Sequence, residues 1–390
     1  MNELRRKIEQ EIAERGPVPF SRYMELCLYE PKFGYYSRSA SQFGKAGDFF
    51  TSSDVHAVFG RLLARHFDEM WRLLGSPEQI VFRELGPGRG LFAQDVLDWS
   101  EKKFPEFFRG LRYELVEQSP ALRTRIAETL RARFDSGKTV FTNFNENPHF
   151  SRTERARNGA PKDFEGHRVS TIVFANEFFD ALPVEILSSR GSLRIDSRDG
   201  RFVESWASAS AEEMEFLDRY SVHPQEHERV EVSLASQTAM SSACEMERGF
   251  VVVIDYGYTR DEQLAGRHRG TVKAIRQHSV SANPYEAPGE QDITADVNFT
   301  SLAALAEQRG LAAQKLMTQS QFLMGIGEAN QFADAFEDCR LPQERAKVAL
   351  QLKHLVTPAG MGESFHALVA SKGISPEKVS KLSGLSFGRR

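Results

Sequence analysis

The chain has 390 residues, enough for one large α/β domain with insertions or for two ordinary domains. Its composition, 41% hydrophobic and 27% charged, is typical of a globular protein and excludes a disordered or fibrous chain. The formal net charge of -4 gives no overall positive field that would attract a nucleic-acid backbone, so we expect no nucleic-acid partner.

The N-terminal region predicts a helical arm. Charged residues begin at once, without the apolar run of a secretory signal, and apolar residues at helical spacing predict a helix over residues 3–15. The aromatic-rich stretch 20–36 indicates that this arm packs onto the body of the protein. A glycine-punctuated loop at 42–53 and a helix at about 55–74 follow.

From residue 80 onwards, strands alternate with helices. Helical patterns at 91–103 and 119–133 separate the first apolar runs. The expected strands are residues 80–85, 113–117, 139–141, 170–175, 249–255 and 365–370. This alternation predicts an α/β fold with a mostly parallel, doubly wound sheet.

Two segments interrupt the alternation. Residues 183–245 mix short strand-like and helical patterns, and residues 257–298 are loop-like and rich in Arg and His. Long insertions of this kind usually carry specificity. We therefore divide the chain into an arm (1–75), the first half of a core (76–182), an inserted segment (183–245) and the second half of the core (246–390), the last with a loop insertion at 257–298.

Neither a disulfide framework nor a metal site is indicated. Cys27, Cys244 and Cys339 are widely separated, and the histidines show no metal-ligand spacing. No stretch approaches the roughly 20 apolar residues that span a bilayer. Because these features suit a reducing compartment, we expect a cytoplasmic protein without a metal or a membrane span.

A glycine turn joins the strand at 80–85 to the helix that follows it. Gly86, Gly88 and Gly90 have G-x-G-x-G spacing, whereas a dinucleotide fingerprint reads G-x-G-x-x-G. Such a turn lets the backbone approach a polar ligand at a helix N-terminus, although a tight turn without a ligand is the alternative.

Two acids suit S-adenosylmethionine, which has an ammonium, a carboxylate and a ribose diol but no pyrophosphate. Glu84 can hold the ammonium directly or through water, and Glu117, at the end of the next strand, can accept the ribose hydroxyls. Both lie at the carboxyl ends of strands, where open α/β sheets bind ligands. For Glu117, a charged strand end that faces water is the alternative.

At this point the chain resembles the MidA-type S-adenosylmethionine-dependent methyltransferases, which include the mitochondrial complex I assembly-factor protein arginine methyltransferase. The matching motifs run along nearly the whole chain. They include Gly47-Asp48-Phe49-Phe50-Thr51, the glycine turn, Val116 to Pro120, Asn176 to Pro183, Ile254-Asp255-Tyr256-Gly257 and Pro288 to Thr294. The Asn176 to Pro183 run and the Gly-Asp-Phe loop are the most specific.

The resemblance implies a Rossmann-like class I methyltransferase with S-adenosylmethionine as cofactor. It also implies a seven-stranded, mostly parallel sheet, an N-terminal helical arm over the cofactor pocket and a substrate-side insertion. Gly47, Asp48 and Phe49 would then close over the cofactor, although packing of the arm against the body is a competing explanation.

The residues after the fourth strand suggest an acceptor site. The guanidinium of arginine keeps its proton near neutral pH, but a carboxylate can hold it in a bidentate grip. Glu177 is the first candidate for that role and Asp180 the second, although Asp180 could simply be a helix N-terminal acid. Asn176 is assigned to the cofactor site, or else is a turn residue. Asp255 and Tyr256 could line the acceptor pocket or form an ordinary strand-end turn.

Some residues depart from the family pattern. Where the family is expected to read Asp-Ile-Thr-Ala-His-Val-Asp-Phe, this chain has Asp296 for the His and Asn298 for the Asp. The leading hypothesis is methylation of arginine in a protein, with a respiratory complex I subunit as one candidate. The alternatives are a small-molecule N- or O-methyltransferase and a non-catalytic assembly factor that binds the cofactor. The oligomeric state stays open.

Overall fold

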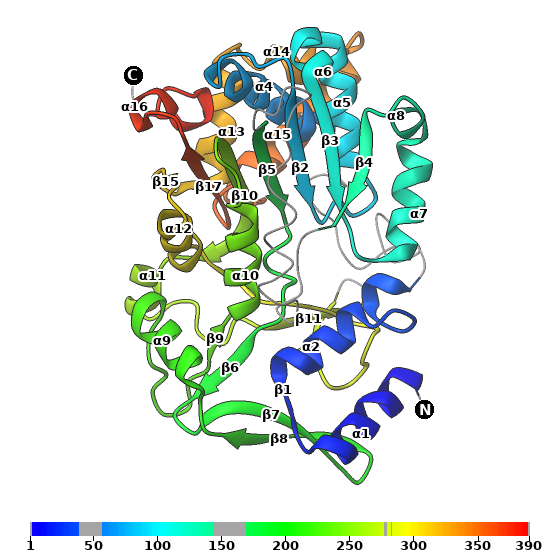
Figure 1. The fold of residues 1–390 in the computed structure, drawn as a ribbon, viewed down its shortest axis with the longest axis vertical. Helices are drawn as coiled ribbons and strands as arrows, with labels where there is room; N and C mark the ends of the chain where they lie inside the picture. Colours follow the sequence, from blue (N-terminus) through cyan, green and yellow to red (C-terminus); the bar gives the residue numbers. More distant parts are fainter. Residues whose placement is uncertain (1, 39–56, 144–168, 277–278, 282, 389–390) are drawn as a thin grey trace.

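A computed structural model describes residues 2–38, 57–143, 169–276, 279–281 and 283–388. Its centre is a large mixed sheet (Figure 1), which within these residues has the strand order β15-β17-β10-β5-β2-β3-β4, with β14 beside β10 and β16 beside β17. The strands are β2 (Ile80–Leu85), β3 (Leu111–Val116), β4 (Thr139–Thr142), β5 (Ser170–Asn176), β10 (Gly249–Tyr258), β14 (Val297–Asn298), β15 (Ala312–Ala313), β16 (Met317–Thr318) and β17 (Phe365–Lys372).

The expected parallel arrangement holds for the central strands. β4, β3, β2, β5 and β10 run parallel to their neighbours, and β17 runs antiparallel to β10. The expected count of seven strands differs from the nine strands found in the described residues. Three of the nine, β14, β15 and β16, are two-residue pairings, which are too short to leave a hydrophobic period in the sequence.

Helices cover both faces of this sheet. One face packs against α4, α5, α13 and α15, and the other against α10 and α12. The helices that follow the arm are α4 (Ala57–Leu73), α5 (Leu91–Lys103), α6 (Pro105–Gly110), α7 (Pro120–Thr129), α8 (Arg131–Asp135), α9 (Ala211–Tyr220), α10 (Leu234–Ala243), α11 (Arg260–Leu264), α12 (Phe299–Gln308), α13 (Gln319–Glu328), α14 (Ala333–Phe336), α15 (Pro342–Val356), α16 (Pro376–Val379) and the 3-10 helix η3 (Ser383–Leu385). The helix expected at 119–133 is divided at Leu130 into α7 and α8. No described helix is both long and apolar enough to cross a membrane.

The N-terminal arm packs onto a second sheet, called here the arm sheet. Its order is β1-β7-β6-β9, and β8 pairs with β7. The arm consists of α1 (Glu3–Arg15), β1 (Val18–Pro19), α2 (Phe20–Tyr29) and the 3-10 helix η1 (Tyr35–Ser37); the other strands are β6 (Glu185–Ser188), β7 (Gly191–Arg198), β8 (Arg201–Ala207) and β9 (Val230–Val232). Apolar residues of α1 and α2 are buried against this sheet, so the predicted packing of the arm is confirmed.

The segment 257–298, expected to be loop-like, contains regular structure. Besides α11 and β14 it forms a three-stranded antiparallel sheet, called here the small sheet, in the order β12-β11-β13. The strands are β11 (Lys273–Arg276), β12 (Ser279–Ser281) and β13 (Asp292–Thr294). They are three or four residues long, and β11 begins and ends on basic residues, so the sequence has no run of alternating apolar residues there.

Candidate active site

Four neighbouring strands of the large sheet end at the same edge. In this order, β10 carries Asp255, β5 ends at Asn176, β2 leads into the glycine turn and β3 leads into Glu117. The chain leaves β2 for β3 on one side and later returns to β5 on the other, so the boundary between β2 and β5 is a topological switch point. Open α/β sheets bind ligands in the crevice at such a point.

The backbone of the glycine turn favours glycine at each of its three positions. Gly86, Gly88 and Gly90 have φ angles of 63°, 54° and 78°, in the left-handed region that side chains disfavour. A Cβ at Gly86 would lie 2.9 Å from Cδ2 of Phe178, whereas one at Gly88 would meet no atom within 4 Å. The turn therefore packs against the residues after β5 on one side and leaves open space beside Gly88.

Both predicted cofactor acids lie at the carboxyl ends of neighbouring strands. Glu84 is buried in β2 and accepts a hydrogen bond from the hydroxyl of Tyr113 (2.8 Å), and burial raises its pKa to about 8. Glu117 follows β3 and accepts a hydrogen bond from the N–H of Ser119 (2.7 Å); burial raises its pKa to about 7. These carboxyls therefore titrate near neutrality, where a bound cation or hydroxyl would favour the charged form.

The 176–181 turn follows β5 and presents the predicted acceptor residues. Glu177 is half-buried with a φ of 49°, an uncommon conformation for a residue with a side chain and one that recurs at functional sites. The Asn176 amide donates a hydrogen bond to Oε1 of Glu177 (3.2 Å). Oδ1 of Asn176 is buried, and no hydrogen-bond partner meets it in the described part of the chain. An acceptor atom is thus available beside Glu177 for a donor from a ligand.

Asp255 lies beneath this turn. Its Oδ2 accepts hydrogen bonds from the backbone N–H groups of Phe178 (3.2 Å), Phe179 (3.0 Å) and Asp180 (3.4 Å), and its Oδ1 accepts one from Tyr256 (2.9 Å). The side chain is completely buried. Asp255 therefore supports the turn, and its predicted contact with an acceptor stays a prediction.

Tyr256 connects β10 to the same turn. Its hydroxyl donates to Oδ2 of Asp180 (2.6 Å). Asp180 is 3% exposed, and burial raises its pKa to about 6. Its Oδ1 has no hydrogen-bond partner in the described residues, and no ion pair involves it there. A cationic acceptor nitrogen would supply both a donor and an opposite charge to this carboxylate.

The arm adds residues that the sequence did not single out as functional. The Tyr29 hydroxyl donates to the carbonyl of Ala181 (2.9 Å), and the Tyr36 hydroxyl donates to Oδ1 of Asp292 (3.0 Å). The aromatic motif around Tyr36 was visible in the sequence, but only as part of the family resemblance. Gly47, Asp48 and Phe49, predicted to cover the cofactor, lie outside the described residues.

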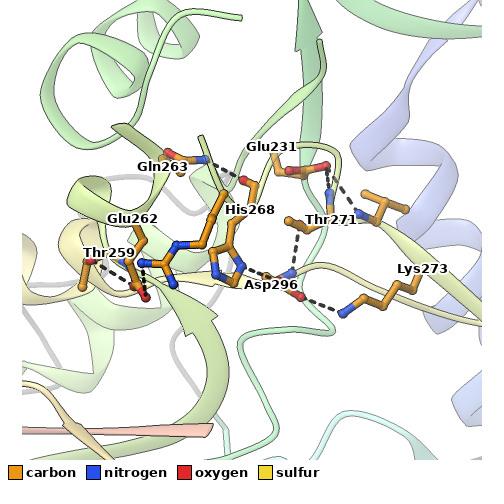
Figure 2. Close-up of polar contacts among 10 residues, drawn as sticks. Glu231, Thr259, Glu262, Gln263, His268, Thr271, Lys273 and Asp296 are labelled. Carbon is orange, nitrogen blue, oxygen red and sulfur yellow. Dashed lines mark hydrogen bonds and ion pairs between the residues drawn. The ribbon is translucent and has the colours of Figure 1, made fainter. Parts of the chain in front are cut away.

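A polar cluster beside the site involves one of the residues that departs from the family pattern. Figure 2 shows Asp296 between Lys273 and His268, with Oδ1 2.9 Å from Nζ and Oδ2 3.0 Å from Nδ1. The Lys273 ammonium also lies 5.1 Å from the centroid of the Tyr256 ring. Lys273 is therefore bound to Asp296 and leaves the carboxylate of Asp180 to other partners.

The second departure, Asn298, has a structural role. Its Oδ1 accepts from the N–H of Ser301 (2.9 Å) and caps α12, and its Nδ2 donates to the carbonyl of Tyr220 (2.9 Å). An Asp would keep the N-cap but could not donate to the Tyr220 carbonyl; both contacts are structural, so this exchange does not require a change of substrate.

Comparisons with known proteins agree with the family resemblance. A model of a family described as S-adenosyl-L-methionine-dependent methyltransferase matches residues 62–317. Protein arginine methyltransferase NDUFAF7 homolog, mitochondrial, of Drosophila melanogaster is 29% identical over 405 residues, covering 98% of this chain and 88% of that protein. Protein arginine methyltransferase NDUFAF7, mitochondrial, of Danio rerio is 28% identical over 380 residues, covering 92% and 84%.

A solved structure matches over the same extent. A Burkholderia thailandensis protein, crystallised with S-adenosyl-homocysteine bound, has 28% sequence identity and a TM-score of 0.79, and the match covers 98% of this chain and 94% of that chain. These findings confirm an α/β methyltransferase fold and S-adenosylmethionine as the cofactor.

The names of the relatives do not support the expected location. The Drosophila and Danio proteins are named as mitochondrial, so these comparisons do not support the cytoplasmic location expected from the cysteines. Widely separated cysteines are compatible with any reducing compartment and do not identify which one.

Proposed function

Because the chain belongs to the family of S-adenosyl-L-methionine-dependent methyltransferases, we propose that it transfers methyl groups to arginine side chains of a protein substrate. The observation that carries this proposal is the contact between the glycine turn and the 176–181 turn, where Phe178 lies against Gly86. A cofactor on the first turn would be next to an acceptor held by the second. The two relatives described above are named arginine methyltransferases, which supports the choice of acceptor.

The described residues fit the cofactor. The open space beside Gly88 and the unpartnered oxygen of Asn176 can accommodate its methionine part. We propose that Glu84 holds the ammonium and that Glu117 accepts the ribose hydroxyls, consistent with two carboxyls of raised pKa on adjacent strand ends.

The chain's own part in the reaction is to hold and orient the acceptor. Bound S-adenosylmethionine supplies an activated methyl group, which leaves sulfur as its bond to the acceptor nitrogen forms. We propose that Glu177 grips the guanidinium while Asp180, oriented by Tyr256, binds a second N–H group. This grip aligns the attacking nitrogen and localises electron density on it. The excess proton leaves the nitrogen after transfer, and a carboxylate with a pKa near 6, such as Asp180, can accept it.

Radiolabelling tests whether the methyl acceptor is a protein. Purified protein, labelled S-adenosylmethionine and a host lysate should yield labelled protein, and mass spectrometry should place the label on arginine. Label in a small molecule would instead support the second hypothesis, and binding without any transfer would support a non-catalytic assembly factor. A respiratory-complex subunit is one candidate acceptor.

Cofactor binding should depend on pH. The ammonium of the cofactor binds the ionised form of Glu84. Because the pKa of Glu84 is about 8, this carboxyl is mostly protonated in the free protein at pH 6–7. Affinity should therefore rise as the pH rises from 6 to 8, by up to about tenfold per pH unit, with release of a proton on binding. Calorimetry in buffers of different ionisation enthalpy measures both effects. Glu84→Gln should remove most of this dependence, and a wild-type affinity that is flat over this range would contradict the role of Glu84.

A further inference from the structure

The 3-10 helix η1 contacts the cofactor side of the site. The hydroxyl of Ser119 donates to the backbone carbonyl of Tyr36 (3.0 Å). The N–H of the same serine donates to Oε1 of Glu117 (2.7 Å). One residue therefore connects η1 to the acid at the end of β3 and fixes the position of Tyr36 relative to the strand ends.

The backbone of Tyr36 contacts Ser119, whereas its side chain contacts the small sheet. Its hydroxyl donates to Oδ1 of Asp292, the first residue of β13, which is 3% exposed. Burial raises the pKa of Tyr36 well above its usual value, and the carboxylates of Asp292 and Asp180 raise it further. Tyr36 is therefore a permanent donor at neutral pH, and its hydroxyl lies near both acids.

A second tyrosine strengthens this connection. The rings of Tyr29 and Tyr36 are 5.4 Å apart, and Tyr29 donates to the carbonyl of Ala181 in the 176–181 turn (2.9 Å). The backbone N–H of Ala295 donates to the carbonyl of Asp180 (3.0 Å), which ties the small-sheet segment to the same turn. The arm, the turn and the small sheet thus meet around Asp180.

From these contacts we propose that Tyr36 is a positioning residue for a cationic nitrogen acceptor and acts through Asp292. By holding β13 against the arm, Tyr36 keeps the carboxylates of Asp292 and Asp180 on the same side of the proposed acceptor site. A guanidinium or ammonium bound there would face the cofactor side, to which η1 is also attached. This inference rests on the proposed function, because it assumes that an acceptor is methylated at this site.

The test compares Tyr36→Phe with Tyr285→Phe in the full chain. The control is matched because the Tyr285 hydroxyl also donates to a carboxylate, Oε1 of Glu204 (2.9 Å), at the arm sheet rather than at the strand ends. Methyl incorporation from labelled S-adenosylmethionine is measured over a range of lysate protein concentrations, and cofactor affinity is measured by calorimetry. Tyr36→Phe should raise the apparent KM for lysate protein about tenfold, with cofactor affinity unchanged within about twofold. Tyr285→Phe should behave like the wild type.

A double variant tests whether Asp292 transmits the effect. Asp292→Asn keeps an oxygen that can accept from Tyr36 but loses its charge, and it should also raise the apparent KM. Adding Tyr36→Phe to it should raise KM by less than the product of the two separate effects. An unchanged KM in Tyr36→Phe, an equal loss in Tyr285→Phe or a loss of cofactor affinity alone would overturn the inference. A wild-type protein that labels nothing would overturn the proposed function itself.

Discussion

Gly88→Val should reduce S-adenosylmethionine binding by about 100-fold or more, equivalent to about 2.8 kcal/mol. A Cβ at this position would meet no atom of the described residues within 4 Å, so the side chain of a valine would extend into the space left open beside the glycine turn. The φ of 54° adds backbone strain of about 1–2 kcal/mol for a residue with a side chain. Calorimetric titration with S-adenosylmethionine measures the loss directly.

Gly200→Val is a matched control for this strain. Gly200 has a φ of 69° in the turn between β7 and β8, and a Cβ there also meets nothing within 4 Å. Both variants should lose similar thermal stability, and Gly200→Val should bind the cofactor as the wild type does. If Gly88→Val binds normally, or if the two variants lose affinity equally, the cofactor does not lie on the glycine turn.

The long elements of the large sheet could be predicted from the sequence because they are long and periodic. The predicted strand at 80–85 coincides with β2, and the predicted helix at 91–103 coincides with α5. Glu84 and Glu117 were predicted for the same reason, since a residue at a recognised strand end has a known place at the edge of a parallel sheet. The strands of the small sheet were not predicted, because they are short and polar.

The tertiary contacts of the site required the structure. Asp255 stands at the end of a predicted strand, but nothing in the sequence shows that its carboxylate turns back to accept three backbone N–H groups of the 176–181 turn. Tyr36 and Asp292 are 256 positions apart, and their hydrogen bond depends on how the arm folds across two sheets. The sequence places residues at strand ends, whereas contacts between separate units depend on packing that has no local signal.

Glu177→Gln should separate methyl transfer from cofactor binding. Loss of the charged grip on a guanidinium should lower the rate of labelling of lysate protein by about 10²–10³-fold. The affinity for S-adenosylmethionine should stay within about twofold of the wild type, because the glycine turn and Glu84 are untouched. Glutamine keeps the size of the side chain and the strained φ of 49°, so the comparison isolates the charge. Single-turnover labelling together with calorimetry measures the two quantities.

Glu204→Gln is the control for removal of a half-buried carboxylate. Glu204 lies in β8 and is bonded to Arg229 and Tyr285, away from the strand ends of the large sheet. This variant should lose some stability and keep its labelling rate per folded molecule. Full activity in Glu177→Gln would mean that another acid binds the guanidinium. Asp180→Asn would then be the decisive variant, because Asp180 has a buried oxygen without a partner in the described residues. Loss of cofactor affinity in Glu177→Gln would instead place Glu177 in the cofactor site, with Asn176.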